Sequence, residues 1–311
     1  MAKVVFFGTP EYALPTLRAL LACHQVLAVV TQPDRYAGRG RHSLVAPPVK
    51  ELAAAQGVPV WQPERLRRDR ATLVALRELG ADVFVLAAYG QILRPEVLAM
   101  APHGVVGLHA SLLPNYRGAA PIAWAIWRGE AETGVTLMLT DAGMDTGPII
   151  AQQALPIAPD DTTETLTARL AELAAEFLIA TLPAWLAGLI TPRPQDDALA
   201  TLAPPITREQ GRIVWAESAV AIDRQMRACT PWPGTYATYQ GAPLKIISAH
   251  PADAPAPSAS VGTLVGVGRD VAVVTGDGLL VLGTVQPAGK RPMAAADWAR
   301  GQRALPGGRL E

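Results

Sequence analysis

The 311-residue sequence has few cysteines, no excess charge and no long apolar run. Cys23 and Cys229 lie far apart without CxxC or Cys/His ligand spacing, which excludes a disulfide framework and a structural zinc site. Basic and acidic residues number 27 each, so overall charge indicates no nucleic-acid or membrane partner. No stretch suits a secretory leader or a membrane span of about 18 apolar residues. These absences favour a cytoplasmic protein without a metal.

The glycine motifs of nucleotide sites are missing as well. The first apolar run is followed by Gly8-Thr9-Pro10, which is not GxGxxG, and no GxxxxGK[ST] occurs. The sequence therefore does not support a dinucleotide or P-loop site.

Short apolar runs alternate with amphipathic helical patterns over residues 1–190. This alternation predicts an α/β domain: an open parallel sheet, connected by right-handed crossovers, with helices on both faces. Ligands of such sheets bind beyond the carboxyl ends of the strands. The expected strands are 4–7, 26–30, 58–61, 83–86, 104–108 and 135–139, so that AAYGQIL (87–93) and HASLLP (109–114) follow two of them.

The pattern changes after a proline-rich segment. Residues 191–207 contain several prolines and little helical periodicity, so we expect an interdomain linker. Short strands follow over 208–311, and Gly276-Asp277-Gly278 is a hairpin signal. A second domain, a small β-barrel, is predicted there.

His109 is the first candidate for chemistry. A lone histidine is often structural, but this one stands at a predicted strand end. Asp145, on the glycine-rich turn DAGMDTG after another predicted strand, is expected to meet it. A carboxylate beside an imidazole fixes its tautomer, which suits a group that stabilises an oxyanion or shuttles a proton. Ser111 is a weak nucleophile candidate because HASLL lacks the GxSxG pattern.

The segments HASLLPNYRGAAPI and DAGMDTGPI resemble the folate-dependent formyltransferases. FFGTP, TQPDRYAGRGR, AAYGQIL, PWPGTY and VQPAGKRPM extend the resemblance from Val4 to about Arg309 and favour the members that act on tRNA. The resemblance implies a Rossmann-like formyltransferase domain followed by an OB-like barrel. It also implies formyl transfer from 10-formyltetrahydrofolate to the amino group of methionine on initiator tRNA, for translation initiation. The chemistry of this transfer requires no metal, and we expect a monomer.

The resemblance also assigns residues to roles. His109 and Asp145 match the catalytic pair, and Arg39 of the 34–42 loop matches a principal tRNA contact. Arg41, Lys290 and Arg291 are further candidates for tRNA phosphates, although each of these basic segments also fits a plain solvated surface. The positions matched to folate contacts are Ser111, Leu112, Leu113 and Pro114, with Ala87, Ala88, Tyr89, Gly90, Gln91 and Ile92 in the loop that closes over the pterin.

One position departs from the family pattern. Where the family has an asparagine whose amide helps to hold the formyl oxygen, this sequence has Gly107. Loss of one such donor costs roughly 100- to 1000-fold in rate elsewhere. Three explanations stand open: a water fills the amide's space, a neighbour such as Gln91 donates instead, or the protein is a weak or inactive relative.

Two rival functions follow. An amino-sugar N-formyltransferase shares the catalytic domain and folate, but has no use for the GRGR loop (38–41) or for QPAGKRPM (286–293). A non-catalytic tRNA-binding relative is supported only by Gly107.

Overall fold

The computed structural model describes residues 1–37, 43–252, 257–305 and 307–311, which form two compact units. The first unit comprises Met1–Pro121, Glu132–Pro156 and Leu166–Pro204. The second comprises Ile122–Ala131, Ile157–Thr165 and Pro205–Glu311.

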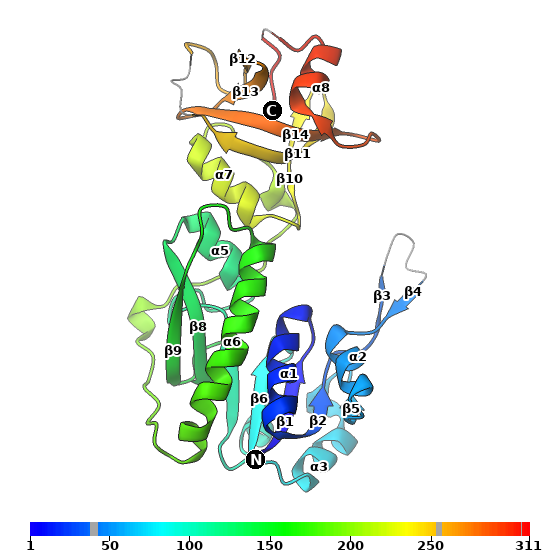
Figure 1. Cartoon of the computed structure of the whole chain (residues 1–311), viewed down its shortest axis with the longest axis vertical. Helices are drawn as coiled ribbons and strands as arrows, with labels where there is room; N and C mark the ends of the chain where they lie inside the picture. The colour runs from blue at the N-terminus through cyan, green and yellow to red at the C-terminus, as the bar shows by residue number, and fades with distance from the viewer. Residues whose placement is uncertain (38–42, 253–256, 306) are drawn as a thin grey trace. The chain divides into compact units, whose positions relative to one another are not determined.

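A seven-stranded sheet with the order β5-β2-β1-β6-β7-β8-β9 forms the centre of the first unit (Figure 1). From β5 to β7 neighbouring strands are parallel, which confirms the predicted α/β architecture with β-α-β crossovers. Because β1, β6 and β7 are parallel neighbours, their carboxyl ends meet at one edge. The strands are β1 (Lys3–Gly8), β2 (Gln25–Val30), β5 (Val60–Trp61), β6 (Val83–Ala87), β7 (Val105–His109), β8 (Glu132–Leu139) and β9 (Ile149–Pro156).

The last two strands correct the expectation of a parallel sheet. β8 runs antiparallel to β7, with Thr136 opposite His109 and Met138 opposite Gly107. β9, which the sequence pattern did not predict, runs antiparallel to β8. The turn that carries Asp145 therefore leaves β8 at the end of the sheet away from His109 and has to return toward it.

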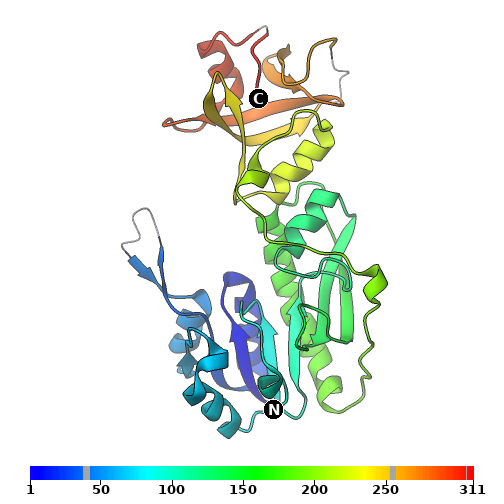
Figure 2. The ribbon, with the colours of Figure 1, turned by 180° about the vertical axis from the view of Figure 1, so that it is seen from behind.

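Successive apolar side chains of β1 point to opposite faces of the sheet, and both sets are buried. Val5 and Phe7 belong to a core cluster with Leu76 of α3 and Val97 of α4. On the other face α1 and α6 lie side by side, as both views show (Figures 1 and 2). The helices are α1 (Leu14–Cys23), α2 (Pro48–Ala55), α3 (Arg70–Glu78), α4 (Pro95–Leu98), α5 (Pro121–Arg128), of which residues 122–128 belong to the second unit, and α6 (Thr163–Leu186), whose first turn also does; the strands β3 (Arg35–Ala37) and β4 (Ser43–Val45) form a separate pair.

The second unit is built on an antiparallel sheet with the order β10-β11-β14-β13-β12, and β15 pairs with β14. Its core cluster joins Ile246, Val273 and Leu282 of the sheet to Ile222 of α7 and Trp298 of α8. This arrangement agrees with the predicted small β-barrel. Its elements are α7 (Ala219–Ala228), β10 (Thr235–Tyr239), β11 (Ala242–Pro251), β12 (Leu264–Val267), β13 (Asp270–Val274), β14 (Leu279–Pro287), β15 (Met293–Ala294) and α8 (Ala295–Gly301).

Candidate active site

His109 is the last residue of β7 and is 7% exposed. Its Nε2 lies 2.8 Å from the backbone carbonyl oxygen of Tyr116. A carbonyl oxygen can only accept a hydrogen bond, so Nε2 carries the proton that this bond uses. The bond fixes the orientation of the ring and leaves Nδ1 for other interactions.

Asp145 faces that second ring nitrogen. Its Oδ2 lies 3.5 Å from His109 Nδ1 and accepts a 2.9 Å hydrogen bond from the backbone N–H of Gly118. With Nε2 protonated, a neutral ring would present an unprotonated Nδ1 to the carboxylate, whereas an imidazolium carries a proton on both nitrogens. The Asp145 carboxylate is therefore placed to accept from an Nδ1 that carries a proton, while Nε2 is committed to the Tyr116 carbonyl.

The backbone around this pair adopts unusual conformations. Tyr116 and Asp145 have φ values of 61° and 56°, in the left-handed region that residues with a Cβ rarely occupy. Such conformations persist only where surrounding bonds hold them. Both residues contact the His109 ring, so the strain lies where the candidate chemistry is.

The turn after His109 is held by one buried hydroxyl. Thr136 Oγ1 donates to the Ser111 carbonyl over 2.7 Å, and accepts from Leu113 N at 3.0 Å and from Gln152 Nε2 at 2.9 Å. The Ser111 hydroxyl itself donates to the Asn115 carbonyl over 2.6 Å. Ser111 is fully buried and paired to this backbone, which argues further against a nucleophile and assigns it to the turn's geometry.

The 87–92 loop follows β6 at the same edge of the sheet. The Tyr89 side chain is 1% exposed and packs edge-to-face against Phe7, so it belongs to the core rather than to an open ligand site. Burial raises the pKa of the Tyr89 hydroxyl. The exposed members of the loop are Ala88, Gly90 and Ile92, with Ala87 buried at the strand end.

Gln91 cannot replace a missing amide at position 107 in this arrangement. Its Oε1 accepts from Leu66 N at 2.9 Å, and its Nε2 donates to the carbonyl oxygens of Pro63 and Glu64. Both ends of the side chain are therefore already bonded to the 63–66 backbone, and the structure contradicts the explanation that Gln91 supplies the donor.

The space above Gly107 is occupied by side chains of β8 and the residue after it. A Cβ placed at position 107 would lie 2.7 Å from Thr140 Oγ1 and 3.2 Å from Met138 Cε. Thr140 Oγ1 is buried and has no hydrogen-bond partner among the described residues. The packing therefore suits glycine, and an asparagine would have to displace both neighbours.

The predicted tRNA contacts divide between described and undescribed parts of the chain. Arg39 and Arg41 lie outside the described residues. At the start of their loop, Asp34 accepts hydrogen bonds from Gln62 and Lys50, and these bonds lower the pKa of its carboxyl group. Lys290 and Arg291 are exposed on the turn between β14 and β15.

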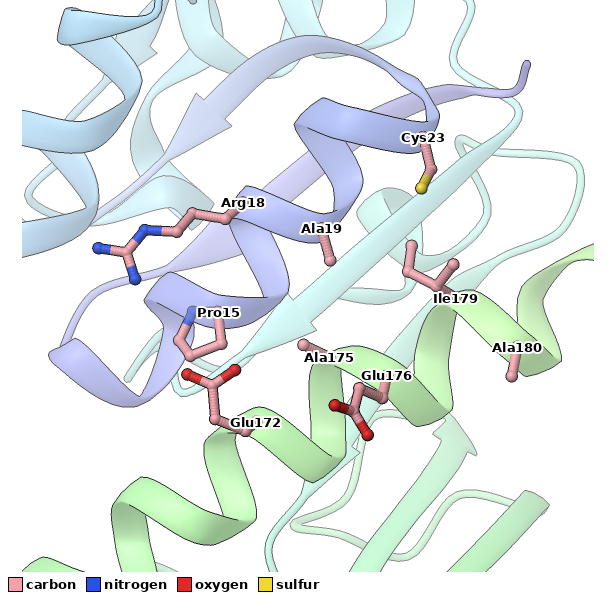
Figure 3. Close-up of a pocket in the computed structure, with 9 residues that line it drawn as sticks. All are labelled: Pro15, Arg18, Ala19, Cys23, Glu172, Ala175, Glu176, Ile179 and Ala180. Carbon is pink, nitrogen blue, oxygen red and sulfur yellow. The ribbon is translucent and has the colours of Figure 1, made fainter.

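A pocket of about 670 Å³ lies elsewhere on the first unit, between α1 and α6 (Figure 3). Ala19, Ala175 and Ile179 line it with Glu172 and Glu176, and it is separate from His109 in the sequence and on the sheet. Over the described ranges, there is no group of three or more His, Cys, Asp or Glu residues placed to hold a metal, and no helix long and apolar enough to cross a membrane.

Two family models match the chain. The model described as formyl transferase covers residues 2–182, and the model of the formyl transferase C-terminal domain covers residues 205–303. The chain belongs to the formyl transferase family. This formyl transferase is 52% identical over 310 residues to a methionyl-tRNA formyltransferase of Roseiflexus castenholzii, across 99% of this chain and 98% of the relative. It is 47% identical over 306 residues to a methionyl-tRNA formyltransferase of Myxococcus xanthus, across 98% and 96%.

Solved structures support the fold of this formyl transferase. The N-formyltransferase of Helicobacter canadensis, in complex with folinic acid and dTDP-3-aminofucose, has a TM-score of 0.68 at 20% identity, over 92% of this chain and 100% of that one. A sugar 3N-formyltransferase, crystallised with dTDP and 5-N-formyl-THF, has a TM-score of 0.67 at 19% identity, over 94% and 99%. At these identities the likeness concerns architecture alone.

Several residues of the candidate site are not predicted by the sequence pattern. Arg117, Thr136, Gln152, Gln195 and Thr201 all bond to the backbone or to the side chains around His109 and Asp145. Arg117 is 7% exposed, and no local pattern marks Gln195 or Thr201, because their partners are 48 or more residues away.

Proposed function

We propose that this protein transfers the formyl group of 10-formyltetrahydrofolate to the amino group of methionine on initiator tRNA. The observation that carries the proposal is similarity over the whole chain, through both family domains, to proteins named methionyl-tRNA formyltransferase. The sugar formyltransferases share the fold at only 19–20% identity, so the identity favours the tRNA substrate over an amino sugar.

The arrangement of His109 and Asp145 fits this reaction. The methionine nitrogen attacks the formyl carbon, the carbonyl oxygen becomes an oxyanion, and the bond from that carbon to the folate nitrogen then breaks. A protonated His109 stabilises the oxyanion through its positive charge, since its Nε2–H is donated to the Tyr116 carbonyl and its Nδ1 faces Asp145. Asp145 stabilises the imidazolium through the Nδ1 contact and, with an ordered water, takes the proton that the attacking amine loses. That proton is then delivered to the folate nitrogen as its bond to the formyl carbon breaks, so the transfer balances.

The remaining assignments are part of the same proposal. The turn Ser111–Pro114, in which the buried Ser111 holds the backbone, and the exposed loop residues Ala88, Gly90 and Ile92 bind the folate at the carboxyl edge of the sheet, where such sheets bind ligands. Arg39, Arg41, Lys290 and Arg291 contact tRNA phosphates. The first compact unit, which extends to Pro204, is the catalytic domain, and the second, which contains residues 208–311, is the tRNA-binding domain of a cytoplasmic monomer.

Formylation of charged tRNA tests the proposal directly. The purified protein, 10-formyltetrahydrofolate and methionyl initiator tRNA should yield formylmethionyl-tRNA at a rate proportional to enzyme. Matched reactions with methionyl elongator tRNA and with a dTDP-amino sugar test the acceptor. Formylation of the amino sugar but not of the tRNA would show that the acceptor is a sugar. Absence of formylated product with every acceptor would overturn the proposal.

A further inference from the structure

Residues 193–203, which we name the strap, run along the first unit beside the candidate active site. At one end, Arg193 exchanges backbone hydrogen bonds of 2.8 and 2.7 Å with Ile149. At the other, Ala203 N donates to the Arg117 carbonyl over 2.8 Å, and the Ala203 carbonyl accepts from Ala120 N at 3.1 Å. The segment expected to be a linker is thus fastened at both ends to the unit that contains His109.

Thr201 of the strap holds the residue on one side of the His109 ring. Its hydroxyl accepts a 2.8 Å hydrogen bond from Tyr116 N, and its carbonyl accepts a 2.9 Å bond from Arg117 N. These bonds fix the left-handed backbone of Tyr116, whose carbonyl oxygen is the partner of His109 Nε2.

Gln195 of the strap holds the residue on the other side. Its Nε2 donates 2.8 Å bonds to the carbonyl oxygens of both Asp145 and Gly147, and so fixes the backbone on both sides of Thr146. The orientation of the amide is not ambiguous, because the 7%-exposed Arg117 donates to Gln195 Oε1 from Nε at 3.0 Å and from Nη2 at 2.8 Å. Arginine has no acceptor, so the oxygen must face it and the nitrogen must face the carbonyls.

We infer that Gln195 and Thr201 are positioning residues for the formyl transfer reaction, an inference whose kinetic part rests on the proposed function. The strap holds the two strained residues that contact the two nitrogens of the His109 ring. Among the hydrogen bonds of the described residues, those of Gln195 and Thr201 go to neighbours of the ring and not to the ring itself. Their role is to keep Asp145 and the Tyr116 carbonyl at the separation at which a protonated ring interacts with both.

Thr201→Val and Gln195→Leu test the inference in the full-length protein. Each removes the bonding atoms while keeping the approximate size of the side chain. A displacement of about 1 Å at a catalytic group can cost on the order of 100-fold in rate. We expect kcat to fall by about 10- to 100-fold, with little change in KM for either substrate. Thr201→Ser, which keeps the hydroxyl, should restore kcat.

Asp196→Ala is the matched control within the strap. Asp196 is exposed, and its side chain accepts only from the nearby Ala198 N among the hydrogen bonds of the described residues. This variant should keep the kcat of the unsubstituted protein. An equal loss of kcat in Asp196→Ala, or kcat within twofold of the unsubstituted protein in both Thr201→Val and Gln195→Leu, would overturn the inference.

The imidazole ¹⁵N resonances of His109, compared with a His109→Gln sample for assignment, give a readout that needs no turnover. Both positioning variants should move these resonances, and Asp196→Ala and Thr201→Ser should not. Unchanged resonances in both positioning variants overturn the inference even if activity falls. If the unsubstituted protein forms no formylmethionyl-tRNA, the proposed function fails, and the resonances alone decide whether the strap positions the ring.

Discussion

The two units differ in what their left-handed backbone residues do. In the first unit, left-handed non-glycine residues occur in the loops after β6, β7 and β8, at Ala88, Tyr116 and Asp145. In the second, Gln240 and Arg303 adopt this conformation, the former in the turn between β10 and β11. A left-handed turn residue in the second unit serves chain reversal. In the first unit the same conformation at Tyr116 and Asp145 aims groups at His109, so the backbone strain there accompanies the candidate catalytic geometry.

Of the substitutions considered, His109→Ala should have the largest effect, because it removes the group at which the strained residues of the first unit are aimed. Removal of a group that stabilises charge and orders a proton path is expected to lower kcat by about 100- to 10,000-fold. Folate binding, measured by titration, should be largely retained because the turn held by Thr136 is intact. The exposed His250 of the second unit provides the control, and His250→Ala should retain activity. Near-normal turnover of the His109 variant would show that His109 is not a catalytic residue.

Gly107→Asn tests whether the first unit is packed around glycine. The new side chain must displace Thr140 Oγ1 and Met138 Cε. Overpacking of this kind costs about 1–3 kcal/mol of unfolding free energy, measurable by urea denaturation, and we expect kcat to fall with it. Adding Thr140→Ala should recover part of both losses. A faster single variant would instead show that the natural site is impaired for want of the amide.

Basic residues should affect tRNA binding rather than the chemical step in both units. Arg39→Ala and Lys290→Ala are each expected to raise KM for tRNA several-fold while kcat at saturation is kept. Each should also reduce the slope of log affinity against log salt by about one, as loss of a phosphate contact does. Arg67→Ala, an exposed site on the first unit, is the control. An unchanged slope would show that the substituted residue does not contact a tRNA phosphate.

The smallest expected effect concerns the two cysteines, whose reactivity compares how accessible a thiol is in each unit. Cys23 of the first unit is exposed, whereas Cys229 of the second is buried, and burial raises the pKa of its thiol to about 12. A thiol reagent at pH 8 should modify Cys23 only, as judged by mass spectrometry, until denaturant exposes Cys229. Equal labelling of both would show that the second unit opens readily.

The raised pKa of Cys229 also makes the free energy of unfolding depend on pH. The folded protein holds the thiol proton more tightly than the unfolded chain, so this contribution is complete below the unfolded pKa of about 8.5. It is lost as pH rises from there toward the folded value of about 12. Cys229→Ser should flatten the fall of the urea midpoint over that alkaline range.

The sequence predicted most of the parallel sheet and the pairing of His109 with the Asp145 turn, because strand ends and glycine-rich turns are local signals. The direction of β8 was not predictable, since the apolar pattern of a strand is the same in both directions. Tyr89 was assigned to a ligand loop because a loop residue buried in the core leaves no local trace. Gln195 and Thr201 were missed because their bonds depend on a distant part of the chain.

The attachment of the strap also determines where the chain can be cut. A fragment that ended at residue 190, the boundary expected from sequence, would keep His109 and Asp145 but lose every contact from Gln195 and Thr201. The first compact unit extends to Pro204. A shortened protein intended for crystallography, inhibitor screening or exchange of its carboxyl-terminal part should therefore include the residues up to 204, because the end of this unit is defined by its hydrogen bonds rather than by the prolines.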